Sequence, residues 1–500
     1  MTKTQCFFSA RLSEDGTVQT LGVSHCHLGS EPEGRQLPQD SRVFAQWTWD
    51  GSQLHASNDY SGYLPLFYSW NAREIFVSGS LGQLAALGVP LDWDEAALGV
   101  FYRCGFFLGD HTPFKNVKVL PPGATLTWER GVLSLSASRR LPKPQPLSAE
   151  QAIEGYIESF RAAIRRHALP PEGTALPLTG GRDSRQIALE LGRMGKLPRR
   201  CVTCGDGRDI QSANQLASRL GLSQTVIAPS QRPVKDSLEK NERTHFCALE
   251  HTWLLPLWEY LKSEFINSYE GTGVGVLTRT ELLDRSFIEL HERNQLHAIG
   301  KTLFERIGPG EAFFKRLPSE FSFLARSEDS AIELFARELD SLADAASPLS
   351  ALSFWSWGRR AISLNPFALM TGLSQISTPF LDRDLYDFVA SLPVGVILEQ
   401  EPQTAAIRRA FPEYADIPFY DELPQARARF DKSAVQRVIN ARDRLRAMAA
   451  HMPKALLPML RLNVSEEKGH QRNARVNALL HLAQLSHLQR HGAAQGHHQE

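Results

Sequence analysis

Short apolar stretches alternate with turn signals over the first 140 residues. Residues 44–49 (FAQWTW) lead into an Asp50-Gly51 turn, and the chain returns through residues 53–57, which is typical of a β-hairpin. The same pattern predicts two further strand pairs, 64–69 with 74–79 and 124–128 with 132–136. We therefore expect a β-rich N-terminal domain over residues 1–140.

A proline-rich segment follows this domain. Residues 141–147 (LPKPQPL) contain three prolines in seven positions, which favours a stiff and extended backbone. We interpret residues 141–147 as the linker between two domains.

The spacing of apolar residues changes after the linker. A capping-box pattern at residues 148–151 precedes apolar residues that recur on one helical face, at positions 153, 157, 160 and 164. Short apolar strands are then predicted at 175–178, 200–203 and 224–227, separated by helices at about 184–195 and 209–220.

This alternation of strand and helix predicts an α/β fold with a doubly wound parallel sheet. Helical patterns dominate from about residue 245, so the second domain is expected to span residues 148–485 and to end in a helical part. Residues 486–500, rich in His, Gln, Gly and Ala, are expected to form a disordered tail.

Composition narrows the class of protein. The 500 residues are enough for two or three domains, and 42% of them are apolar. Lys plus Arg and Asp plus Glu both number 55, so charge favours neither nucleic acid nor an anionic membrane. The N-terminal residues lack the apolar core of a signal peptide, and no apolar run approaches the ~20 residues of a membrane span. We expect a cytoplasmic protein without nucleic-acid or membrane partners.

The six cysteines are few for this length and are interpreted as reduced thiols. Cys201 and Cys204 form a CxxC pair, but a metal site would require a second pair of ligands. The simpler interpretation is two small residues on a buried strand.

The most informative segment is residues 178–185 (LTGGRDSR), at the carboxyl end of the first strand of the second domain. Ligands bind at this end of open α/β sheets. A glycine pair alone is more often a tight turn. Here the flanking hydroxyls of Thr179 and Ser184 and the start of a helix favour an anion-binding loop. Asp183 can hold Mg²⁺ on phosphates, which Arg182 or Arg185 can neutralise. The loop is neither a GxxxxGK[ST] nor a GxGxxG motif.

These residues match the SGGxDS signature of the pyrophosphatase-loop ATP enzymes, with Thr179 in place of the first serine. Other segments are similar to the asparagine synthetase family in the same order along the chain. They are 59–68 (DYSGYLPLFY), 113–123, 363–367 (SLNPF), 378–393 (TPFLDRDLYDFVASLP) and 406–418. The resemblance covers about residues 40–425.

The resemblance implies a fold and an activity. Members of the family join a glutaminase-like (Ntn-type) sandwich to a synthetase domain, which adenylates a carboxylate from ATP and releases pyrophosphate. Ammonia or an amine then attacks the acyl-AMP. The implied cofactors are ATP and Mg²⁺, and the implied substrate is a small-molecule or peptide carboxylate; a homodimer is compatible with these features. By the same resemblance Asp183 is the metal ligand, and the ATP-binding residues are Thr179, Gly180, Gly181, Arg182, Asp183, Ser184, Arg185, Thr203, Gly271 and Gly273.

Three departures from the family pattern affect these expectations. The glutaminase nucleophile is an N-terminal cysteine, whereas Cys6 lies in the apolar context QCFFS; we interpret it as a buried strand cysteine and the domain as an inactive scaffold. The second phosphate-side loop aligns with residues 269–278 (YEGTGVGVLT), which places Gly275 where the family has a metal-binding Asp. Gln375 likewise replaces a family glutamate. The side chains that could restore the lost charge are Glu270, Glu281 and Asp284.

Three functions are therefore considered. The first is an asparagine synthase-like amide ligase without glutaminase activity; it would use ammonia or an amine on its own substrate, as β-lactam synthetases and lasso-peptide cyclases do. The second is a catalytically degenerate homologue that binds a nucleotide or a partner protein. The third, a pyrophosphatase-loop enzyme acting on tRNA, is disfavoured by the neutral charge and the β-rich N-terminal half.

Overall fold

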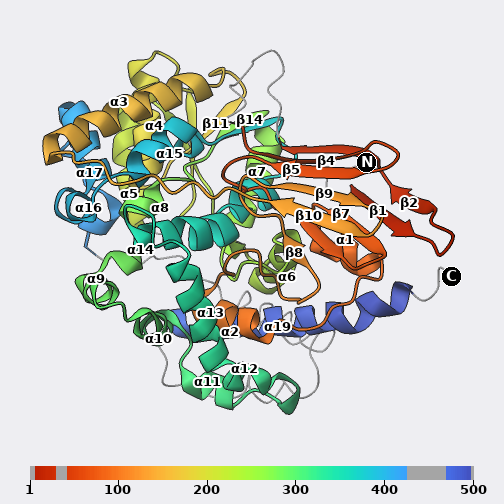
Figure 1. Ribbon diagram of the computed structural model, residues 1–500. Helices are drawn as coiled ribbons and strands as arrows, with labels where there is room; N and C mark the ends of the chain where they lie inside the picture. The colour runs from red at the N-terminus through yellow and green to blue at the C-terminus, as the bar shows by residue number, and fades with distance from the viewer. Residues whose placement is uncertain (1–5, 30–41, 206, 425–468, 497–500) are drawn as a thin grey trace.

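The computed structural model describes residues 6–29, 42–205, 207–424 and 469–496. The fold is α/β, with antiparallel sheets in the N-terminal part and a parallel sheet surrounded by helices in the C-terminal part (Figure 1). This is the fold class that the sequence predicts.

Two antiparallel five-stranded sheets form the N-terminal sandwich. The first has the order β2 (Val18–Gly22), β1 (Phe7–Leu12), β7 (Glu74–Ser78), β6 (Phe67–Trp70) and β8 (Lys118–Val119). The second has the order β10 (Val132–Ser136), β9 (Thr125–Glu129), β5 (Leu54–Asn58), β4 (Phe44–Trp49) and β3 (His25–Gly29). Alternate side chains of both sheets meet in one apolar core, in which Trp47 and Trp128 are fully buried.

The predicted hairpins are present, but the N-terminal part is not purely β. The β4–β5 and β9–β10 pairs lie where the sequence indicates, and the first strand of the 64–69 pair begins only at Phe67. Two helices, α1 (Leu81–Ala86) and α2 (Glu95–Cys104), were not predicted. Asp94 caps α2, which packs on α13 (Glu328–Asp340) of the C-terminal part.

The parallel sheet has the order β13-β12-β11-β14-β15. Its strands are β11 (Thr174–Pro177), β12 (Arg200–Thr203), β13 (Ser223–Val226), β14 (Asn267–Tyr269) and β15 (Gln375–Ser377). The chain moves outward from β11 to β13 and then returns to the other side of β11, as in a doubly wound sheet. The order therefore reverses between β11 and β14, and the carboxyl ends of these strands define the expected ligand crevice.

The helices between the strands follow the prediction closely. They are α3 (Ala149–His167), α4 (Arg182–Arg193) and α5 (Gly207–Arg219). The capping box of Ser148 and Gln151 at the start of α3 is confirmed. The strands β14 and β15 were not predicted, because each contains only three residues and too little pattern to detect.

Helices dominate the rest of the chain, as predicted. They are α6 (Pro233–Arg243), α7 (Leu255–Glu264), α8 (Gly275–Thr278), α9 (Arg285–Glu292), α10 (Leu296–Ile307), α11 (Glu311–Lys315), α12 (Phe323–Arg326), α14 (Pro348–Leu352), α15 (Arg383–Ala390), α16 (Val394–Gln400), α17 (Pro402–Ala410) and α19 (Gly469–Gly496). Two π-helical segments, η6 (Ser353–Ile362) and η7 (Asn365–Leu369), lie between α14 and β15.

Buried guanidinium groups join the two parts of the molecule. Arg359 of η6 donates to the carbonyl oxygens of Gly62, Gly109 and Leu120 at 2.7–3.1 Å, and its neighbour Arg360 also donates to Gly109 O. Each of these arginines is less than 5% exposed. Their buried hydrogen bonds therefore attach η6 directly to the N-terminal part. The linker is packed as well, since the Gln145 N–H donates to Ser391 O.

The expectation of a disordered tail from residue 486 is wrong for residues 486–496, which continue α19. The helix packs on α1 and α6 through buried apolar side chains such as Leu482 and Leu485. His481 is fully buried, and its Nδ1 is 2.9 Å from the Tyr102 hydroxyl. Residues 486–496 have few apolar side chains, so their sequence gives no sign of a docked helix. The buried contacts of α19 come mainly from the residues before 486. Residues 497–500 lie outside the described part of the chain.

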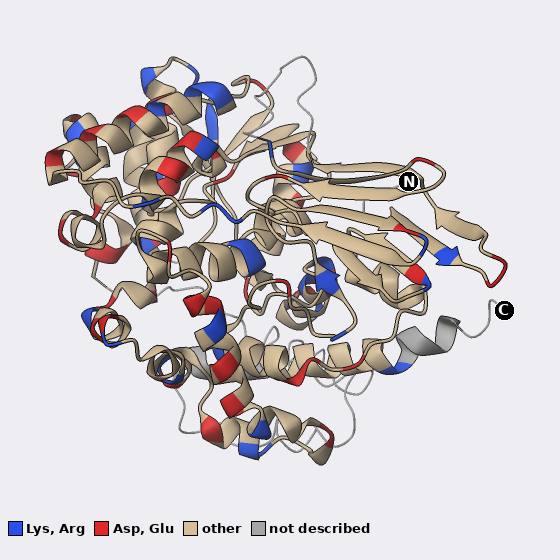
Figure 2. Ribbon diagram, in the orientation of Figure 1, with Lys and Arg blue, Asp and Glu red and all other residues tan. Residues whose placement is uncertain are grey.

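Charged residues of both signs are mixed along the helices, and Figure 2 shows no face of a single sign in this view. Among the described residues, no helix combines the length and the apolar character needed to cross a membrane.

Candidate functional site

The loop after β11 is braced by its own hydroxyl groups. The Thr179 N–H donates to Ser184 Oγ at 3.0 Å, and the Gly181 N–H donates to Thr179 Oγ1 at 3.2 Å. Gly181 is the N-cap of α4, and no side chain caps the first N–H groups of that helix. The loop therefore presents a fixed helix N-terminus, which is a favourable environment for an anion.

This helix start faces a cavity of about 870 Å³. The cavity lies between the β11 and β14 loops, at the point where the strand order reverses. Loop residues 179, 181–184, 270–273 and 275 line one side, and apolar side chains of η3 (Thr252–Leu254), α7 and η6 line another.

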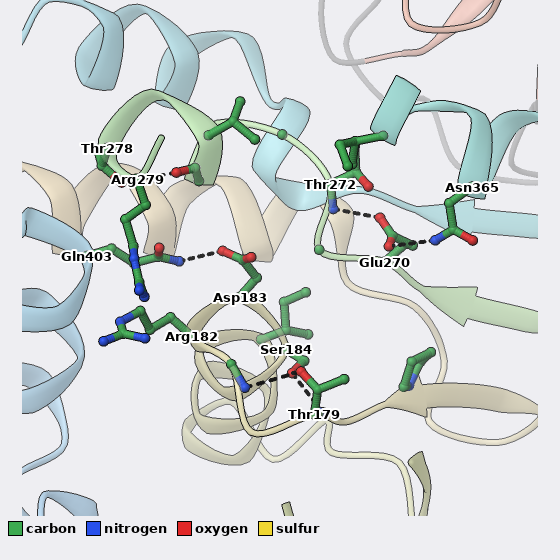
Figure 3. Close-up of a pocket in the computed structure, with 18 of the residues that line it drawn as sticks. Thr179, Arg182, Asp183, Ser184, Glu270, Thr272, Thr278, Arg279, Asn365 and Gln403 are labelled. Atoms are coloured by element: carbon green, nitrogen blue, oxygen red, sulfur yellow. Dashed lines mark hydrogen bonds between the residues drawn. The ribbon is translucent and has the colours of Figure 1, made fainter. Parts of the chain in front are cut away.

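Asp183 is the central carboxylate of the cavity (Figure 3). Gln403 of α17 donates to its Oδ1 at 2.7 Å. Burial raises the pKa of Asp183 above its ordinary value, while the Gln403 bond and the positive charges of Arg279 and Arg182 act in the opposite direction. A bound cation would relieve the cost of ionising this buried carboxylate.

Arg182 and Arg279 lie side by side near Asp183 (Figure 3). Both pair with Asp421, at 3.0 Å from Arg182 Nη1 and 2.7 Å from Arg279 Nη2. Arg182 is further held by Thr404, whereas the Arg279 side chain is 36% exposed. The two arginines thus place positive charge beside the loop, and Arg279 is the one with freedom to move.

Glu270 provides a second carboxylate directly after β14. Its Oε2 accepts the Thr272 N–H at 2.6 Å, and its Oε1 accepts from Asn365 Nδ2 at 3.1 Å (Figure 3). Burial raises the pKa of Glu270, and the negative charge of Asp183 raises it further. The two carboxylates are therefore close enough to influence one another.

The second loop packs directly on Asp183. A Cβ atom at Gly275 would lie 2.8 Å from Asp183 Oδ1, and one at Gly271 would lie 2.8 Å from Asp183 Cβ. The structure thus brings together the two positions that the family resemblance assigns to one metal, and it leaves only Asp183 with a carboxylate there.

Three predicted site residues do not line the cavity. Arg185 is 2% exposed, and its guanidinium donates to Ile417 O and Pro418 O, so it braces the loop from behind. The Gly180 N–H donates to Asp209 Oδ1, and the fully buried Thr203 hydroxyl accepts from Gln224. The polar groups of these residues are turned into the protein and away from the cavity, and their contact with a nucleotide stays a prediction.

The other proposed replacement carboxylates lie at the cavity edge. Glu281 and Asp284 are exposed, and Asp284 caps α9 and pairs with Arg306 at 3.6 Å. Gln375 is on β15 and does not line the cavity. Of the carboxylates considered from the sequence, Glu270 is the one held inside the cavity beside Asp183.

Several lining residues were not predicted. Gln403 and His251 belong to segments far from the loop in sequence, and no local pattern marks them. Arg279 directly follows the second loop, and Asn365 lies in the SLNPF segment that carries the family resemblance, so both had a usable signal.

The donor set fits a magnesium ion that is carried by a nucleotide. Within the described ranges, no group of three or more His, Cys, Asp or Glu side chains could hold a metal ion by itself. Mg²⁺ commonly takes one or two protein carboxylates and completes its shell with phosphate oxygens and water. Asp183, with Glu270 nearby, offers this number of ligands.

The comparisons with known proteins concern the N-terminal part. A glutamine amidotransferase domain matches residues 36–138. A comparison of the chain with curated proteins gives no match. The matched segment includes strands β4 to β10 of the sandwich.

Cys6 lies just before β1 rather than within it, and its side chain is half-buried against the sandwich core. Its carbonyl oxygen accepts from Ser78 Oγ at 3.0 Å. The expectation of a buried strand cysteine is thus wrong in detail. Residues 1–5, whose removal would expose the Cys6 amine, lie outside the described residues.

Proposed function

We propose that the protein forms amide bonds in an ATP-dependent, AMP-forming reaction, in which a carboxylate is adenylated and then attacked by ammonia or an amine. One observation carries this proposal: Asp183 stands at an uncapped helix start, in a cavity at the sheet reversal point, with a second carboxylate and two arginines around it. This combination suits a magnesium-bound triphosphate.

The chain's own groups would divide the work as follows. The α4 N–H groups and the Thr179–Ser184 loop bind the leaving pyrophosphate, and Arg279 neutralises the charge that develops on it. Asp183 and Glu270 would hold Mg²⁺, which would withdraw charge from the phosphates. Gln403 fixes the orientation of the Asp183 carboxylate, and Asn365 fixes that of Glu270.

The N-terminal domain would serve as a scaffold in this proposal. Its amidotransferase-like sandwich is locked to η6 by Arg359 and Arg360, and η6 contributes Trp357 and Ile362 to the cavity wall. The domain then supports the synthetase site instead of supplying ammonia from glutamine.

Exchange of labelled pyrophosphate into ATP tests the proposal. We expect exchange that depends on one member of a panel of aspartate, other amino acids and peptides, and that is lost in Asp183→Asn. Exchange without any carboxylate dependence, or exchange unchanged in Asp183→Asn, would contradict the proposal.

A second function has one specific observation in its favour. Gly275 leaves a single carboxylate where the family resemblance implies two, as in a homologue that binds a nucleotide without turnover. Tight Mg-ATP binding with no exchange for any carboxylate would favour this alternative.

A further inference from the structure

His251 is a cavity residue to which the family resemblance assigns no role. It is 5% exposed, lies in the cavity wall beside Trp253 and Leu254, and adopts a left-handed backbone conformation with φ 78°. Left-handed backbone is unfavourable for a residue with a Cβ atom, and such strain is concentrated at functional sites.

One hydrogen bond fixes the tautomer of this imidazole. His251 Nε2 lies 2.9 Å from Ala361 O of η6. A carbonyl oxygen can only accept, so Nε2 carries the proton and Nδ1 carries the lone pair. Among the residues that the structure describes, none donates a hydrogen bond to Nδ1. Nδ1 is also not one of the fully buried polar atoms that lack a partner, so it is accessible. The lone pair is therefore open to the cavity.

Two successive π-helical segments, η6 and η7, hold His251 and the carboxylate site. Ala361 anchors His251, and four residues later Asn365 anchors Glu270. His251 and Glu270 both line the cavity, so the imidazole and the carboxylate border the same space.

The chemistry of a neutral, desolvated imidazole suits a nitrogen nucleophile. Burial lowers the pKa of His251 to about 4; the hydrogen bond to Ala361 O acts against this shift and the positive charge of Lys240 acts with it, so the ring is neutral at neutral pH. Nδ1 of a neutral ring can accept a hydrogen bond from the N–H of an uncharged amine, and the lone pair of that amine is then free to attack. The phosphate charge of an acyl-AMP would favour the protonated ring as the reaction proceeds.

We propose that His251 is the catalytic base of amide formation, with Nδ1 accepting the proton of the attacking amine; this rests on the proposed function above. The amine nitrogen bonds to the acyl carbon, the bond from that carbon to the AMP oxygen breaks, and AMP leaves with the electron pair. The proton lost by nitrogen passes to Nδ1 and then to water.

Two variants separate this role from a structural one. His251→Gln keeps a donor for Ala361 O but offers no base, whereas His251→Asn loses that donor and also offers no base. In both variants we expect carboxylate-dependent pyrophosphate exchange within about twofold of the parent. Amide formation from ammonia should fall about a hundredfold or more, the usual contribution of a positioned base.

Two controls accompany these variants. Trapping of the adenylate by hydroxylamine, a strong nucleophile that is uncharged at neutral pH, should remain at the parent rate in both. His245→Gln changes a buried histidine that also has a left-handed backbone and a pKa lowered to about 4, but that does not line the cavity. It should leave the ratio of amide formation to exchange unchanged.

The remaining outcomes overturn the inference in distinguishable ways. Parent-like amide formation in His251→Gln would assign the histidine a structural role only. A raised KM for ATP with reduced exchange in both variants would place it in nucleotide binding. A parent that shows no exchange with any carboxylate would overturn the proposed function, and the inference with it.

Discussion

Gly275→Asp restores the carboxylate that the second loop lacks, and its effect should depend on magnesium. The new Cβ would lie 2.8 Å from Asp183 Oδ1 and 3.5 Å from Oδ2, so the two carboxylates would be forced to about van der Waals distance. Two unit charges about 4 Å apart repel by about 4 kcal/mol at an effective dielectric of 20 and by about 1 kcal/mol in water. Without a cation, the variant should therefore lose about 1–4 kcal/mol of unfolding free energy.

Gly275→Asn is the matched control, because it has the same shape without the charge. We expect the Asp variant to unfold at a clearly lower temperature than the Asn variant in EDTA at pH 8. Saturating Mg-ATP should close this gap, since a shared Mg²⁺ turns the repulsion into joint coordination. Pyrophosphate exchange should rise in the Asp variant, because a second ligand orients the phosphates better. Equal melting temperatures for the Asp and Asn variants, with and without magnesium, would refute this reasoning.

Three further predictions concern the loop, the N-terminal domain and the last helix. Asp183→Ala should abolish the stabilisation that Mg-ATP gives the parent, about 2.7 kcal/mol at a hundredfold excess over Kd; thermal shifts equal to those of the parent would contradict it. Cys6→Ala should leave pyrophosphate exchange unchanged, and glutamate release from glutamine should be at background in both the parent and the variant. An intact mass showing Cys6 as the first residue would contradict the scaffold role. Deleting residues 477–500 should lower the melting temperature by many degrees, because α19 buries Leu482 and Leu485 fully. Deleting only residues 497–500 should leave the melting temperature unchanged. Equal melting temperatures for the two deletion variants would show that α19 does not dock.

The sequence predicts the centre of the candidate site well. A glycine pair followed by Asp183 and Ser184, directly after an apolar strand, has few structural explanations, and the structure places this loop at the reversal point of the sheet. Strand and helix alternation also predicts β11, β12 and β13 to within about one residue, because apolar periodicity is a local property.

The parts that sequence reasoning missed depend on packing between distant segments. Gln403 reaches Asp183 across 220 positions of the chain, and a lone glutamine has no recognisable pattern. Arg185 looked equivalent to Arg182, but only the fold shows which arginine faces the cavity and which one donates to buried carbonyls. The helix α2 lies in a region of strand signals, and its packing on α13 supplies much of its stability.

The most direct test of the proposed chemistry is carboxylate-dependent exchange of labelled pyrophosphate into ATP by the full chain in the presence of Mg²⁺. We expect exchange with one class of carboxylate from a panel of aspartate, other amino acids and peptides, lost in Asp183→Asn and reduced in Glu270→Gln. Binding of Mg-ATP without exchange for any carboxylate, in the parent and in Gly275→Asp alike, would contradict the ligase function.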